Sequence, residues 1–77
     1  MKNNLNISFF YQTETKGSIR IYDLLGKQVL QTEMRVKIGS NLVTIPVNKL
    51  INGVYIIEVH AATRQLGIKK VVKEQSN

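Results

Sequence analysis

Glu58 and His60 are the two side chains whose types and spacing come closest to acid–base chemistry. They stand two residues apart, which places both on the same face of a β-strand, and a carboxylate beside an imidazole can take part in proton transfer. Such a pair also needs a nucleophile and a pocket, and no serine lies in the sequence pattern that exposes a catalytic hydroxyl. We therefore interpret the pair as a solvated contact and expect the protein not to be an enzyme. The serines are Ser8, Ser18, Ser40 and Ser76.

Metal and cofactor chemistry lacks its usual ligands in this sequence. The chain has no cysteine, which excludes disulfides and cysteine-based zinc sites, and its single histidine excludes a multi-histidine site within one chain. Its five glycines are scattered one at a time instead of gathering in a phosphate-binding loop, so we interpret them as chain-reversal residues. The sequence predicts no metal and no cofactor. The glycines are Gly17, Gly26, Gly39, Gly53 and Gly67.

The excess of basic residues is the feature that could serve a partner. The 77 residues include eleven Lys or Arg and five Asp or Glu, which gives a formal charge of +6. Most of the basic residues are spread over expected turns and polar faces, and only Lys69, Lys70 and Lys73 form a cluster. Such a charge favours an anionic surface, an acidic partner or nucleic acid, and lysines on an edge strand also prevent aggregation.

Nucleic-acid binding would also require exposed aromatic rings beside basic residues. Phe9, Tyr11 and Tyr55 lie among apolar residues at strand spacing, so we expect them in the core. Tyr22, which shares a polar face with Arg20, is the exception. A small basic nucleic-acid-binding barrel therefore stands as an alternative function, although we expect no nucleic acid as a partner.

The elements that must carry these side chains are strands, because apolar residues recur at every second position. Residues 5–11 and 19–22 alternate in this way, and the turn at 23–27 joins the second segment to another alternating segment that begins at Gln28. After a turn at 39–41, residues 42–47 alternate again, and Pro46 indicates a sheet edge or a strand end. Residues 48–53 are expected to form a compact turn with Leu50 and Ile51 directed inward.

The C-terminal third of the chain holds the strongest strand signals. Residues 54–59 are almost continuously apolar, which predicts a central strand covered on both faces. A hairpin connection at 61–65 leads to a last strand at 66–73, and residues 74–77 form a polar tail. The last strand carries lysines on both faces, and a strand buried on both sides would not tolerate them. We therefore expect an edge strand with an exposed hydrogen-bonding ladder.

The short, regularly spaced strands indicate one all-β domain over residues 1–77, with its core in residues 5–73. Six or seven strands joined by short turns favour an antiparallel sandwich or a small barrel. No segment approaches the roughly 18 consecutive apolar residues of a membrane span, and the first residues lack the apolar core of a signal peptide. An export signal for this domain would therefore lie elsewhere. The exposed edge strand also makes pairing into a dimer possible.

Three segments, in order, resemble the C-terminal sorting domain (type A) of type IX (Por) secretion cargo of Bacteroidetes. The first is a strand that ends in an Asp-x-x-Gly-Lys turn, here Asp23, Gly26 and Lys27. The second is a Gly-x-Tyr strand, here Gly53 and Tyr55. The third is a closing Lys-rich strand, and its residues are Lys69, Lys70, Val71, Val72 and Lys73. Together the segments cover most of residues 5–73.

The resemblance implies an Ig-like antiparallel β-sandwich of about seven short strands that works as an address label. The outer-membrane secretion machinery would recognise it and carry an N-terminally fused cargo across the outer membrane. A sortase-like peptidase would then remove the domain, and the cargo would be attached to the cell surface or released. The closing strand would be the recognition signal, read by strand addition and by charge. An Ig-like adhesion module is a further alternative.

One departure from the family pattern lies at the start of the chain. Family members usually open with a Tyr-Pro-Asn-Pro-like segment just before the first strand, and this chain begins at that strand with Met1-Lys2-Asn3-Asn4. We therefore expect either a fragment of a longer precursor or a stand-alone module.

Overall fold

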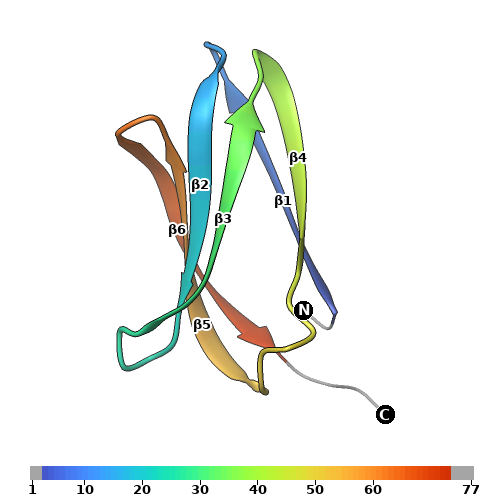
Figure 1. Ribbon diagram of the computed structural model, residues 1–77, viewed down its shortest axis with the longest axis vertical. Helices are drawn as coiled ribbons and strands as arrows, with labels where there is room; N and C mark the ends of the chain where they lie inside the picture. The colour runs from blue at the N-terminus through green and yellow to red at the C-terminus, as the bar shows by residue number, and fades with distance from the viewer. Residues whose placement is uncertain (1–2, 74–77) are drawn as a thin grey trace.

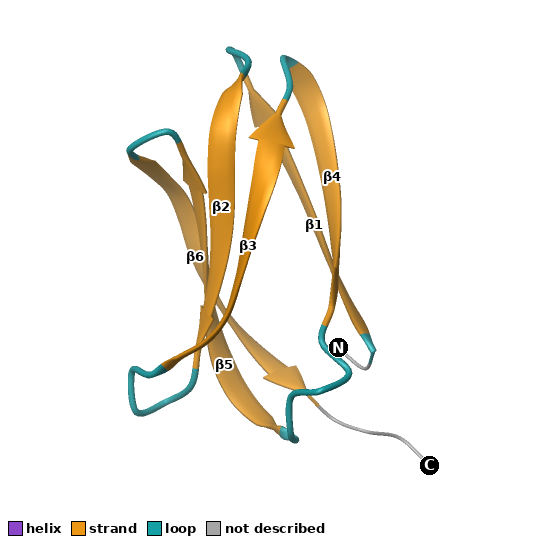
Figure 2. Cartoon of the chain, in the orientation of Figure 1, coloured by secondary structure: helices purple, strands orange, loops and turns teal. Residues whose placement is uncertain are grey.

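The computed structural model of the protein describes residues 3–73, so the predicted polar tail at 74–77 lies outside the described residues. Those residues form six strands and no helix, which confirms the all-β prediction (Figures 1 and 2). The count lies within the six or seven strands expected from spacing and is one fewer than the seven that the resemblance implied. No helix long and apolar enough to cross a membrane occurs in residues 3–73. The strands are β1 (Asn4–Tyr11), β2 (Thr15–Tyr22), β3 (Gln28–Val36), β4 (Gly39–Pro46), β5 (Gly53–Ala61) and β6 (Arg64–Lys73).

The strands form two sheets of unequal width. One sheet pairs β1 with β4, and the other has the strand order β3-β2-β5-β6. Every pairing is antiparallel, as predicted. The predicted hairpins at 23–27 and 61–65 join β2 to β3 and β5 to β6, whereas the connections before β2, before β4 and before β5 cross between the sheets (Figure 1).

The core lies between the inner faces of the two sheets. Alternation along the strands decides its members: Leu5 of β1 and Ile45 of β4 meet Ile19 of β2 and Ile57 of β5. Tyr55 is buried, as expected, whereas Phe9 and Tyr11 are half-buried. At about 25 cal/mol per Å² of apolar surface removed from water, this burial is the main stabilising term. The full cluster is Leu5, Ile19, Ile21, Ile45, Val47, Tyr55 and Ile57.

Several local predictions need correction. Strand β2 begins at Thr15, before the alternating segment 19–22 that we expected, and β4 begins at Gly39, inside the segment 39–41 that we expected to be a turn. Ile51 is 81% exposed, so it does not point inward, although Leu50 is half-buried against the core. A short apolar pair in a polar turn does not have to be buried, because single exposed apolar side chains are common on protein surfaces.

Strand β5 is central within its sheet, between β2 and β6, but it is not covered on both faces. Its inner face carries Tyr55 and Ile57, and its outer face carries half-buried Ile56, Glu58 and His60. The outer residues are shielded by neighbouring side chains of the same sheet and not by a second layer. The prediction of cover on both faces, which rested on a near-continuous apolar run, was therefore wrong for the outer face.

Gly17 lies within β2, where no chain reversal occurs, so our interpretation of this glycine was wrong. A Cβ atom built on Gly17 would lie 2.6 Å from the carbonyl oxygen of His60 and 2.8 Å from a methyl group of Val36. The position needs glycine because neighbouring backbone approaches it closely, a recognised role of glycine within strands.

We expect Gly17→Ala to lower the free energy of unfolding by about 1–3 kcal/mol, since the backbone oxygen of His60 cannot move aside without disturbing the β2–β5 ladder. Gly67→Ala is the matched control, because a Cβ at Gly67 meets nothing within 4 Å. Urea unfolding of the two variants measures the difference. Equal stability of both variants would show that β2 and β5 are not packed so closely at Gly17.

Candidate functional site

The Asp-x-x-Gly-Lys motif forms the turn between β2 and β3. The Asp23 carboxylate oxygen Oδ1 accepts hydrogen bonds from the backbone N–H groups of Leu25 and Lys27, at 3.0 and 2.9 Å. The N–H of Gly26 donates to the carbonyl oxygen of Asp23 at 3.1 Å, and Gly26 has a φ of +85°, a conformation that glycine adopts without strain. The motif therefore closes a turn, and the Oδ1 atom of Asp23 is already hydrogen-bonded to backbone N–H groups of that turn.

The Gly-x-Tyr motif fastens the start of β5 to the turn before it. Tyr55 is 5% exposed, and its hydroxyl donates a hydrogen bond to the carbonyl oxygen of Ile51 at 2.6 Å. Gly53 has ordinary extended backbone geometry, and a Cβ there would lie 3.9 Å from the Tyr55 ring, which is normal contact. The tyrosine of this motif thus has a clear physical role, and nothing around Gly53 requires glycine.

The five predicted signal residues do not share one surface. Strand β6 pairs only with β5 among the described residues, which confirms it as an edge strand. Lys70 lies opposite Ile56 and Val72 opposite Val54, on the outer face. Lys69 and Val71 lie opposite Ile57 and Tyr55, on the inner face. Lys73 is also an inner residue and is only 5% exposed.

The outer face of β6 is therefore the accessible part of the predicted signal. It carries Ile68, Lys70 and Val72, and Ile68 and Val72 are 57% and 51% exposed. Ile68 was not among the predicted signal residues, although its position two residues before Lys70 was the available clue. Lys73, in contrast, is too buried to meet a partner directly.

Glu58 and His60 meet on the outer face of β5, as their spacing predicted. The distance from His60 Nε2 to Glu58 Oε1 is 3.0 Å, and the Tyr22 hydroxyl donates to the same oxygen at 3.4 Å. Ser18 lies opposite His60 in the strand register, but no side-chain hydrogen bond joins these two residues. Residues 3–73 contain no group of three or more His, Cys, Asp or Glu side chains that could hold a metal ion.

Asn41 is a buried polar residue that we had interpreted only as part of a turn. It is 6% exposed, its Oδ1 accepts a hydrogen bond from the N–H of Lys37 at 2.9 Å, and its Nδ2 donates to the carbonyl oxygens of Lys37 and Gly39. These bonds satisfy its amide and hold the connection from β3 to β4, which crosses between the sheets.

The comparison with protein families gives one match. Residues 1–74 match the family described as the secretion system C-terminal sorting domain. No curated protein matches the chain. The family match covers all six strands together with the three motifs that carried the resemblance.

We expect Tyr55→Phe to lower the free energy of unfolding by about 1 kcal/mol, because the variant keeps the buried ring and loses only the hydrogen bond to Ile51. Tyr22→Phe is the matched control, since its hydroxyl makes a longer bond of 3.4 Å on the half-buried outer face. Thermal unfolding of both variants tests the difference. A larger effect at Tyr22 would contradict the role assigned to Tyr55.

Proposed function

This chain belongs to the family of secretion system C-terminal sorting domains, and from that premise we propose that the outer face and outer edge of β6 are the surface that the secretion machinery reads. As a member of this family, the chain is a C-terminal sorting signal for type IX secretion. It works as part of a larger precursor that is secreted or displayed at the cell surface, and the family implies a source in Bacteroidetes. The partners that follow are the secretion machinery and the fused cargo.

The position of β6 at the edge of its sheet is the observation that most directly supports its assignment as the recognised surface. β6 has a single strand neighbour among the described residues, and its outer face presents Ile68, Lys70 and Val72. An extended partner segment that adds to such an edge gains main-chain hydrogen bonds, and side chains at alternate positions supply selectivity. Lysines on the same edge suppress unspecific pairing, so the machinery must offer a matching charge.

We also propose that the two sheets form an Ig-like sandwich. The supporting feature is the hydrogen bond from the buried Tyr55 hydroxyl to the carbonyl oxygen of Ile51, four residues upstream. A tyrosine that bonds back to the preceding corner is a recurring feature of Ig-like domains. The crossing connections between the sheets agree with that topology.

After transport, a sortase-like peptidase removes the domain from its cargo in this proposal. The resemblance to type IX cargo supports that step. The nucleic-acid alternative is not favoured, because Tyr22, the aromatic residue beside Arg20, is half-buried and bonds to the Glu58 carboxylate. An anionic nucleic acid would meet that carboxylate on the same face.

A charge reversal on β6 tests the proposal. In a reporter fused to this domain and expressed in a type IX-competent host, we expect Lys70→Glu to lower surface delivery by about tenfold, the effect of losing about one charge-assisted contact. Cell-surface labelling of the reporter measures delivery.

Arg35→Glu is the matched control, because Arg35 is an exposed cation on the same outer face but on the opposite edge strand, β3. Circular dichroism of both purified variants establishes that they are folded. Delivery that falls equally in both variants would indicate a response to net charge and would overturn the assignment of β6.

A further inference from the structure

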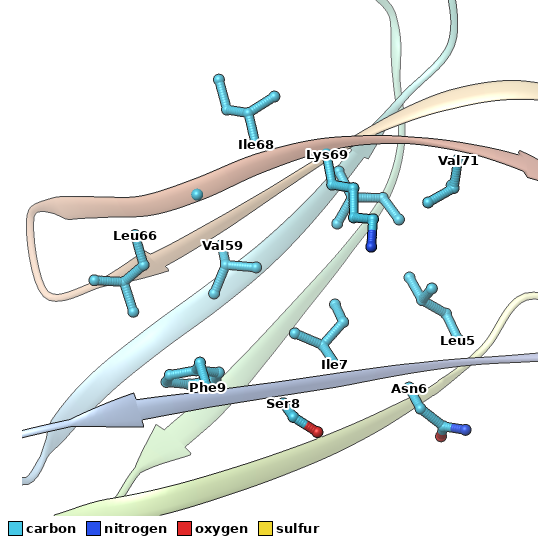
Figure 3. A pocket seen from close by; sticks show the side chains of 12 residues that line it. Leu5, Asn6, Ile7, Ser8, Phe9, Val59, Leu66, Ile68, Lys69 and Val71 are labelled. Carbon is cyan, nitrogen blue, oxygen red and sulfur yellow. The ribbon is translucent and has the colours of Figure 1, made fainter.

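A groove of about 320 Å³ opens between β1 on one side and β5 and β6 on the other (Figure 3). Ile7 and Phe9 of β1 form one wall, and Val59, Leu66 and Val71 of β5 and β6 form the other. All five side chains are half-buried. These apolar groups belong to the inner faces of the sheets, but no strand covers them from the open side among the described residues.

Lys69 extends into this apolar groove from the inner face of β6 (Figure 3). Its register partner is Ile57, a core residue, whereas the neighbouring Lys70 points to the outer face. No acidic side chain lines the groove, and Lys69 has no ion pair with any residue of the described chain. Lys69 is exposed, so a carboxylate can reach its ammonium group, and the apolar side chains around that pair would partly exclude water once a segment is bound, which strengthens an ion pair.

The groove also runs beside a free strand edge. Among residues 3–73, β1 pairs only with β4, and its sheet has two strands against four in the facing sheet. A strand added to β1 would widen the narrow sheet to three strands and would cover the inner face of β6. Gly67 leaves space there, since a Cβ at that position would meet nothing within 4 Å.

Charge argues against a second copy of this chain as the occupant. The protein carries a formal charge of +6, and an added copy would bring further cations to a groove whose one charged group is Lys69. Like charges brought together in this way oppose association. The complementary occupant is instead apolar on one face and acidic at one position.

We propose that this groove binds one extended segment of another protein, which pairs with the free edge of β1 and places a carboxylate on Lys69 between apolar side chains. The site is distinct from the outer face of β6, so the proposal does not depend on how that face is read. It assigns different roles to two adjacent lysines: Lys69 binds the carboxylate in the groove, and Lys70 belongs to the outer face of β6.

The test is a titration of the whole domain, followed by NMR, with a capped peptide about nine residues long, roughly the length of one strand. Valines at alternate positions share one face of the peptide with a central glutamate, and a second peptide has lysine in place of the glutamate. We expect shifts in the amides of β1 and β6, and an affinity about tenfold higher for the glutamate peptide. Lys69→Glu should reverse that preference, and Lys70→Glu should leave it unchanged.

Gly67→Val provides a second variant that narrows the groove; its Cβ would meet nothing within 4 Å, and we expect the variant to stay folded and to bind the glutamate peptide at least about tenfold more weakly. The proposal is overturned if no shifts arise at about 1 mM peptide, or if both peptides bind equally to the unmodified domain. A separate titration with decanoate, a carboxylate with an apolar chain, serves as a lipid probe. Binding of decanoate without binding of either peptide would identify a lipid site instead. Self-association that shifts the same amides on dilution would identify a second copy as the occupant.

Discussion

The structure depends on one geometric constraint: a sheet of two strands cannot cover a sheet of four. The shared core forms where β1 and β4 face β2 and β5, and it excludes water there through fully buried residues such as Ile19, Ile21 and Ile45. Beyond that overlap, the inner face of β6 keeps a half-covered apolar surface and a lysine. The same mismatch therefore produces the stable centre of the domain and the open groove between the edges of β1 and β6.

Two of the three motifs stabilise the packing of the sheets, and the third lies on an exposed strand. Asp23 and Gly26 close the β2–β3 turn, and Tyr55 fixes the entry into β5, which supports both neighbouring strands. Lys69 and Lys70 of β6 contribute little to the core, since both are exposed, whereas Lys73 is buried. In our proposal β6 is the signal strand, and it stays displayed only while β5 is held in place beside it.

Much of the fold could be predicted from sequence, because period-two alternation defines strands and their inner faces. The core role of Tyr55, both hairpins and the edge position of β6 followed from that pattern. What failed depended on contacts between distant segments. The need for Gly17 comes from the backbone of His60 and a methyl of Val36, and the number of strands in each sheet follows from pairing that alternation does not specify. For the candidate site, the sequence pointed to the strand that forms β6 and placed lysines on both of its faces, but it could not predict the groove beside Lys69, because the groove is formed with β1, at the other end of the chain.

Amide hydrogen exchange along β1 tests the central claim, that the unequal sheets leave this strand with an open edge. An antiparallel strand paired on one side has hydrogen-bonded and solvent-facing amides in alternation, whereas a strand paired on both sides has all of its amides bonded. The account predicts fast exchange at every second residue of β1 and uniformly slow exchange along β5, which is paired with both β2 and β6. Uniform protection along β1 in a dilute sample of the domain would contradict it.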